Sequence, residues 1–187
     1  MLMAAIGDMT GGARALGAVL DALEEEGVLT VACCGNFCAA GAAARETLEL
    51  ARAREVYCIQ GPLDHAASRF VRRKEHLRER FDEAAFAALE EAHAALDGAA
   101  IEFLCALPKR RDIELDGHAI TLCYGAPSSA TRPLSAAANP DRFEREREFA
   151  EADIVLCGSG EAPFSRMVHG ALFVNPGPLL AGPGIAR

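Results

Sequence analysis

The stretch Gly7-Asp8-Met9-Thr10-Gly11 separates a short apolar run, residues 2–6, from a segment with helical periodicity. The run before it has the length and composition of a buried strand. The segment after it carries apolar residues on one helical face, at Leu16, Val19, Leu20 and Leu23. A second apolar run, Val28 to Cys34, then ends at Cys34-Gly35-Asn36. This order of strand, glycine-rich turn, helix and strand is typical of a parallel βαβ unit.

The rest of the chain continues this alternation and then changes its period. Further helices are predicted for the apolar stripe Ala44, Thr47, Leu48 and Ala51, for 66–80, for 84–96, around Phe103, and from Asn139-Pro140 onward. Further strands are predicted at 55–59, 112–115, 119–123, 154–157, 164–168 and 171–174. Asp116-Gly117 marks a hairpin turn, and His169-Gly170 a second turn. Parallel units followed by antiparallel strands predict one α/β domain over residues 1–187, with two stacked sheets and helices outside.

Composition limits the classes of function. The chain has 187 residues, 51% of them hydrophobic, and a formal net charge of -8. This acidity argues against broad nucleic-acid binding, which needs a basic face. No apolar run is long enough to span a membrane, and no signal peptide is recognisable, so we expect a cytoplasmic protein that does not bind membranes. Its seven cysteines are expected to be reduced and buried. The basic run 69–80 reads either as a surface for an acidic partner or, preferably, as a solvated helix face.

Five strand ends carry short motifs in a fixed order, followed by Phe173-Val174-Asn175-Pro176-Gly177. The motifs are Gly7-Asp8-Met9-Thr10-Gly11, Cys34-Gly35-Asn36, Gly61-Pro62-Leu63-Asp64, Tyr124-Gly125-Ala126-Pro127 and Cys157-Gly158-Ser159-Gly160-Glu161-Ala162-Pro163. In this order they resemble the calcineurin-like metallophosphoesterases, specifically the small bacterial phosphodiesterase-like branch. Family members read Asp-x-His, Gly-Asp, Gly-Asn-His-Asp, His-Gly and Gly-His-x-His at these places. The resemblance spans nearly the whole chain and implies a four-layer α/β/β/α sandwich.

The same resemblance implies a two-metal centre, but this chain retains little of it. The family holds two cations about 3.5–4 Å apart, which clamp a phosphate and generate a hydroxide. Asp8 matches the first metal-binding aspartate, whereas Thr10 stands in place of the first histidine. Asn36 replaces the aspartate that bridges the metals, and Ser159 and Glu161 replace the last two histidines. Without the bridging charge, two adjacent dications would repel each other strongly.

The leaving-group side of the family's site is changed as well. Pro62 stands in place of a ligating asparagine, and Leu63 in place of the histidine that assists the leaving group. Asp64 matches the aspartate that orients this histidine, whose partner is therefore missing. Tyr124 replaces a further histidine ligand. Neither proline nor leucine can ligate a metal through its side chain, so no catalytic residue is assigned by the resemblance.

We therefore expect a degenerate member of this family that lacks dinuclear phosphoesterase activity and needs no metal cofactor. Its expected role is binding of an unknown protein or of a small phosphorylated ligand. A retromer scaffold subunit of the same fold, which acts mainly in protein binding, is a precedent. The alternative is a divergent metal-dependent hydrolase with a site rebuilt around Asp8, Asp64 and Glu161.

Two ligand sites remain open as alternatives. Asp8, Asn36 and Glu161 can form an oxygen-only pocket for one magnesium, manganese or calcium ion, although hydrogen bonds to backbone and water are the preferred reading. The backbone amides of Thr10, Gly11 and Gly12 lie at an expected helix start, where a phosphate can bind. The negative charge of Asp8 works against that second site.

Other features bear on partners and assembly. Four apolar side chains are expected at the mouth of the former cleft, either as an exposed docking patch or as buried filling: Phe37, Leu63, Tyr124 and Phe164. Cys33 and Cys34 should point to opposite faces of their strand, which argues against a zinc site. Family members continue with further strands after Asn175-Pro176-Gly177, so a chain that ends at Arg187 is expected to be shortened there and to leave a sheet edge open. Such an edge predicts a possible homo-oligomer.

Overall fold

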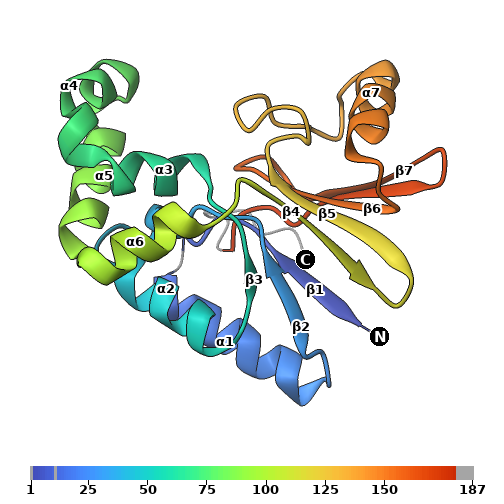
Figure 1. Cartoon of the computed structure of the whole chain (residues 1–187), viewed down its shortest axis with the longest axis horizontal. Coiled ribbons are helices and arrows are strands. Elements are labelled where there is room, and N and C mark those ends of the chain that lie inside the picture. Colours follow the sequence, from blue (N-terminus) through green and yellow to red (C-terminus); the bar gives the residue numbers. More distant parts are fainter. Residues whose placement is uncertain (1, 11, 180–187) are drawn as a thin grey trace.

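A computed structural model describes residues 2–10 and 12–179 of the chain. Two β-sheets stack face to face, and helices cover the outer face of each sheet (Figure 1). The predicted four-layer α/β/β/α sandwich is confirmed. Within the described residues, no helix has both the length and the apolar character needed to cross a membrane.

The first sheet consists of three parallel strands in the order β1-β2-β3. The strands and the helical segments that connect them are β1 (Met3–Ile6), α1 (Gly12–Glu25), β2 (Thr30–Cys33), the 3-10 segment η1 (Phe37–Ala43), α2 (Ala44–Ala53) and β3 (Tyr57–Cys58). Gly27 ends the turn after α1 with a φ of 75°, which favours glycine. Because all three strands are parallel, their carboxyl ends lie at one edge of the sheet.

Four helices follow β3 and extend the outer helical layer: α3 (Pro62–Ser68), α4 (Phe70–Arg80), α5 (Glu83–Ala95) and α6 (Gly98–Ala106). The single helix predicted over 66–80 is wrong, because the chain breaks at Arg69. This residue has φ -118° and ψ 15°, and its N–H group bonds to the nearby carbonyl of Ala66. The helix that contains Pro62 also begins earlier than predicted, since proline suits a first helical turn.

The second sheet has five strands in the order β4-β5-β6-β8-β7. Its elements are β4 (Arg110–Leu115), β5 (His118–Tyr124), α7 (Pro140–Ala150), β6 (Ile154–Gly158), β7 (Phe164–Val168) and β8 (Ala171–Asn175). The two predicted hairpin turns are confirmed: Asp116 and Gly117 both have positive φ, as do His169 and Gly170. The carboxyl ends of the parallel strands β5, β6 and β8 lie at one edge of this sheet.

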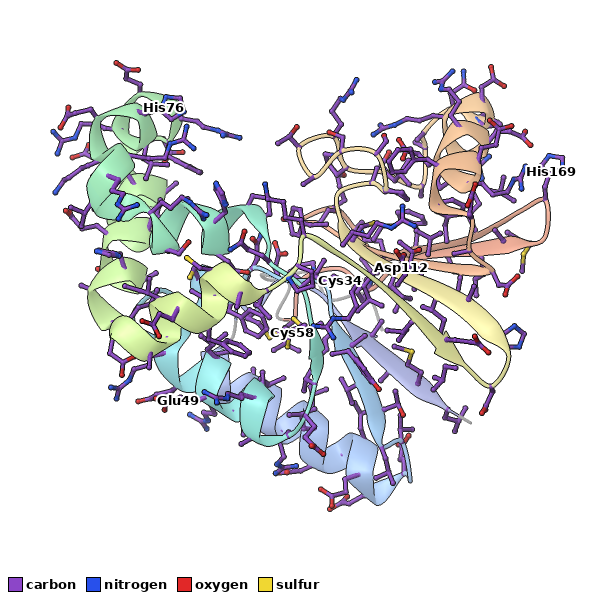
Figure 2. The ribbon with its side chains drawn as sticks, viewed as in Figure 1. Cys34, Glu49, Cys58, His76, Asp112 and His169 are labelled. Carbon is purple, nitrogen blue, oxygen red and sulfur yellow. The ribbon has the colours of Figure 1, made fainter. Side chains whose placement is uncertain are left out.

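Three apolar layers hold the sandwich together. One lies between the first sheet and its helices, one between the two sheets, and one between the second sheet and α7. Cys33 packs in the first layer, whereas Cys34, labelled in Figure 2, packs in the second. The prediction that the two side chains point to opposite faces is therefore confirmed. All seven cysteines are free, and all except Cys105 are buried. Burial raises the pKa of the Cys58 and Cys157 thiols to about 12.

The predicted open edge after Gly177 involves residues 180–187, which lie outside the described part of the chain. The last described residue, Leu179, donates its N–H group to the carbonyl of Asp8 at 2.8 Å. The described chain therefore ends beside the carboxyl end of β1.

Candidate functional site

Asp8 and Tyr124 come from different sheets and meet where the carboxyl ends of their strands converge. Asp8 follows β1 and is buried, and Tyr124 is the last residue of β5. The Tyr124 hydroxyl donates a hydrogen bond to Oδ2 of Asp8 at 3.2 Å. Among the described residues, Oδ1 of Asp8 has no hydrogen-bond partner. Burial raises the pKa of Asp8, and hydrogen bonds from the side chains of Asn36 and Tyr124 offset part of this rise.

Asp64 holds two strand-end loops together. Its carboxylate accepts backbone hydrogen bonds from Asn36 at 2.8 Å and from Cys38 and Gly61 at 2.9 Å. The side chain is completely buried. Burial raises the pKa of Asp64 to about 6, while the three backbone hydrogen bonds act in the opposite direction. In this chain Asp64 therefore organises backbone, because Leu63 offers no imidazole for it to orient.

Asn36 lies in the left-handed region, with φ 62° and ψ 47°, immediately after the turn that follows β2. Its side-chain oxygen accepts a hydrogen bond from the backbone N–H group of Leu63 at 2.9 Å. Gly61 approaches so closely that a Cβ atom at this position would collide with the side chain and backbone nitrogen of Asn36. The amide oxygen is thus used to join the second and third strand-end loops.

Ser159 and Asn175 form a corresponding link in the second sheet. The Ser159 hydroxyl accepts hydrogen bonds from Nδ2 of Asn175 at 2.8 Å and from the N–H group of Glu161 at 3.2 Å. Oδ1 of Asn175 in turn accepts from the N–H group of Gly177 at 2.9 Å. Ser159 and Asn175 are buried, whereas Glu161 is exposed. This network connects the ends of β6 and β8.

The predicted phosphate site at the start of α1 is only partly described, because Gly11 lies outside the described residues. The N–H group of Thr10 donates to the carbonyl of Asp8 at 2.8 Å, and that of Gly12 donates to Met9 at 3.1 Å. The two described amides are therefore already used by local carbonyl groups.

The prediction that four apolar residues gather at the cleft mouth is wrong. Phe37 is fully buried in the layer between the first sheet and its helices, and Leu63 packs against that layer. Phe164 belongs to the layer beneath α7, with its ring centroid 5.9 Å from that of Phe143. Tyr124 packs between the sheets beside Asp8. The four side chains face three different layers, so they form no common docking patch.

Comparison with known proteins agrees with the two-sheet fold described above. Residues 1–184 match the family model described as calcineurin-like phosphoesterase superfamily domain. The chain belongs to the calcineurin-like phosphoesterase superfamily. No curated protein matches its sequence.

Several solved structures share the calcineurin-like phosphoesterase fold. The hypothetical protein PH1004 from Pyrococcus horikoshii OT3 has a TM-score of 0.74 and 20% identity, with 95% of this chain and 75% of that chain covered. A metallophosphoesterase from Sphaerobacter thermophilus has a TM-score of 0.68 and 20% identity, with 95% and 76% covered. A single-mutant Vps29 from Entamoeba histolytica has a TM-score of 0.55 and 22% identity, with 95% and 74% covered. At these identities the likeness concerns the fold alone.

The side chains at the strand ends do not fit the two-metal centre that membership of the calcineurin-like phosphoesterase superfamily implies. In the described part of the chain, no group of three His, Cys, Asp or Glu side chains is arranged to hold a metal ion. Asp8 contributes one carboxylate, but Asn36 is neutral and its oxygen is engaged by Leu63. The Ser159 hydroxyl is likewise engaged by Asn175. At the strand ends, none of the described residues supplies the bridging negative charge that two close dications require.

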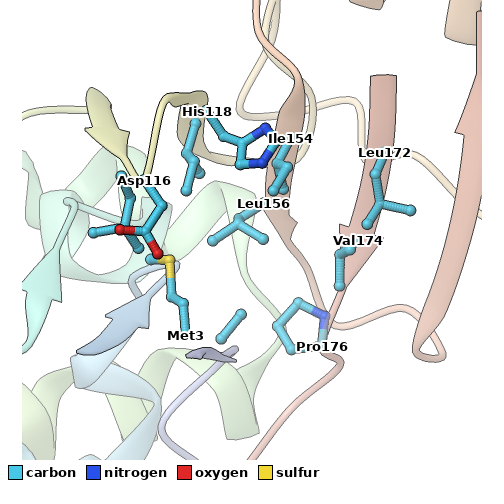
Figure 3. A pocket seen from close by; sticks show the side chains of 11 residues that line it. Met3, Asp116, His118, Ile154, Leu156, Leu172, Val174 and Pro176 are labelled. Carbon is cyan, nitrogen blue, oxygen red and sulfur yellow. The ribbon is translucent and has the colours of Figure 1, made fainter. Parts of the chain in front are cut away.

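A larger cavity lies elsewhere, along the edge between the two sheets (Figure 3). Its volume is about 580 Å³, and most of its lining is apolar, including Met3, Leu156 and Val174. None of the site residues predicted from the sequence lines it. A strand pattern predicts which face of a strand is apolar, but the space left between two such faces depends on how the sheets pack. Sequence reasoning therefore missed this cavity.

Proposed function

We propose that this chain is a calcineurin-like phosphoesterase relative that binds a ligand or partner and does not hydrolyse phosphoesters. The observation that carries the proposal is the contact between Tyr124 and Asp8, in which the Tyr124 hydroxyl donates to Oδ2 of Asp8 at 3.2 Å. From the family resemblance, we expect a histidine metal ligand at position 124. The Tyr124 hydroxyl gives Oδ2 of Asp8 a hydrogen-bond donor that does not require a cation.

Two further contacts support the proposal. Asn36 uses its side-chain oxygen to join the loop at Leu63, and Asp64 uses its carboxylate on three backbone N–H groups. Both side chains thus stabilise the backbone at positions where the family carries out chemistry. The likeness to a Vps29 structure is compatible with a binding role, because the retromer scaffold precedent acts mainly through protein binding.

The test is a hydrolysis assay with matched metal analysis. Purified protein is incubated with Mn²⁺ and with bis(p-nitrophenyl) phosphate or p-nitrophenyl phosphate, and the Asp8→Ala variant is assayed in parallel. We expect no turnover above that of the variant and fewer than two equivalents of bound metal. Turnover that is removed by a chelator and by Asp8→Ala would contradict the proposal.

A second candidate, a divergent hydrolase with one cation, is favoured by a single observation. Oδ1 of Asp8 is buried and has no partner among the described residues, so it offers one free acceptor. A titration with Mn²⁺, followed by electron paramagnetic resonance, tests this candidate. Binding of one equivalent in the wild type that is lost in Asp8→Asn, but kept in the exposed control Asp141→Asn, would favour the hydrolase.

A further inference from the structure

A small cavity of about 150 Å³ opens beside the turn Gly61-Pro62, and neither Asp8 nor Asn36 is among the residues that line it. The loop that follows β5 forms part of its wall through Thr131. Three cationic or titratable side chains line it, His65, Arg80 and Lys109. None of the described residues in its lining is acidic. A cavity lined in this way is suited to a negatively charged group.

The positive charge around the cavity is not neutralised locally. Arg80 and Lys109 form no ion pair with a described residue, although Arg54, Lys74 and Arg110 elsewhere do so. Arg69 and Arg73 add positive charge next to His65. The whole chain nevertheless has a formal net charge of -8. The cationic side chains around the cavity repel one another, and a bound anion reduces that repulsion.

We propose that this cavity binds a compact oxyanion, namely a phosphate or the phosphate group of a phosphomonoester. The combination of Lys109, Arg80 and His65 offers an ammonium, a guanidinium and an imidazole, all of which donate charge-assisted hydrogen bonds to phosphate oxygens. Its volume suits a group of this size better than an extended polymer. The doubly charged phosphate gains more than a carboxylate from several cations at once.

His65 supplies a means of detecting such an anion. Its Nδ1 atom lies 3.2 Å from Oε1 of Gln60 and 3.0 Å from Nη1 of Arg69. The pKa of His65 is lowered by burial first, and then by the charges of Arg69, Lys109 and Arg73. An anion in the cavity favours the imidazolium form and therefore raises this pKa. When Nδ1 of His65 is protonated, it donates a hydrogen bond to Oε1 of Gln60 and can no longer accept one from Arg69.

The inference goes beyond the proposed function, because it holds whether or not the chain hydrolyses phosphoesters. Binding is therefore measured in EDTA, so that no metal can hold the anion at Asp8. The Asp8→Ala variant is included, and we expect it to bind as the wild type does. A loss of binding in this variant would instead assign the anion to the strand-end site.

The probe is inorganic phosphate, titrated at low ionic strength and followed by calorimetry, with acetate as the monoanionic comparison. Replacing Lys109 by Gln removes one charge-assisted hydrogen bond, and we expect affinity to fall about tenfold or more. The matched control Arg72→Gln removes one charge from α4 outside the cavity lining, and we expect less than a twofold change. Equal effects of the two substitutions, or no saturable binding, would overturn the proposal.

Nuclear magnetic resonance of the histidine rings provides a second readout. We expect phosphate to raise the pKa of His65 and to leave that of the exposed His76 unchanged. Absence of a shift at His65, or the same shift at both rings, would also overturn the proposal. Both substitutions above lie at exposed positions, so the variants are expected to fold.

Discussion

At the scale of the residue, Asp64 shows how one buried carboxylate can join the backbone of two loops. Its two oxygens accept from the backbone of Asn36, Cys38 and Gly61, which belong to two different loops. Each of these N–H groups would be buried without a partner if the carboxylate were lost. An unsatisfied buried donor costs about 1–3 kcal/mol.

We therefore predict that Asp64→Asn lowers the free energy of unfolding by about 1–3 kcal/mol at pH 7. The amide oxygen can still accept from Asn36 and Gly61, but the NH₂ group faces the N–H donor of Cys38. Urea denaturation of the two proteins measures the difference. A variant as stable as the wild type would show that these bonds contribute nothing.

The same pair of proteins tests the pH dependence. The pKa of Asp64 is raised from 3.8 to about 6 in the folded state, so the native protein binds this proton more tightly than the unfolded chain. Its contribution to stability is therefore fully present below pH 4 and falls by about 3 kcal/mol at most as pH rises to 6. We expect Asp64→Asn to lose this dependence. Its destabilisation should consequently be larger at pH 4 than at pH 7.

At the scale of the element, the strand-end loops are held close by contacts that only small residues permit. Gly35 has φ 92° and lies against the backbone of Gly61, which in turn abuts Asn36. These contacts bring the ends of β2 and β3 together and set the position of α3. Close packing of Gly35, Gly61 and Asn36 therefore sets the spacing of these two loops.

Gly61→Ala should disturb this arrangement. The added Cβ atom meets the side chain and backbone of Asn36, so we predict destabilisation of about 1–3 kcal/mol from overpacking. Gly98→Ala is the control, since Gly98 begins α6 and no atom lies within 4 Å of a Cβ built there. Thermal or urea unfolding compares the two variants. Equal stabilities would mean that the loop contact is easily relaxed.

At the scale of the whole molecule, the fold depends on three apolar layers, of which the middle one joins the two sheets. Leu122 of β5 is completely buried in this middle layer beside Ala32 and Ile59. Charge is distributed unevenly over the same molecule. The cations around His65 gather near the carboxyl ends of the strands, while the chain as a whole is acidic.

Truncation in the middle layer should therefore be costly. We predict that Leu122→Ala lowers the free energy of unfolding by about 2–5 kcal/mol, because a cavity forms between two sheets that cannot easily close. Leu29→Ala, at a side chain that is 78% exposed, should change it by about 0.5 kcal/mol or less. Denaturant unfolding of both variants measures this. Similar losses would contradict the assignment of the middle layer as a core.

Local sequence patterns predicted which helices, strands and turns form better than they predicted where each helix begins and ends. Asp116-Gly117 and Asn139-Pro140 marked a turn and a helix start correctly, since their backbone preferences act over a few residues. The helix predicted over 66–80 was wrong, because the chain breaks at Arg69 although residues 66–80 include neither glycine nor proline. The grouping of Phe37 with Phe164 also failed, because the two side chains point into different layers.

The amino-acid sequence by itself determined the order of strands and helices, the stacked sheets and the family, because periodicity, turn residues and motif order are readable along the chain. Only the tertiary structure decided which side chains meet at the strand ends. Tyr124 meets Asp8 across 116 residues of chain, and His65 and Lys109 line the same cavity. Contacts of this kind depend on the packing of two sheets, which no local pattern encodes.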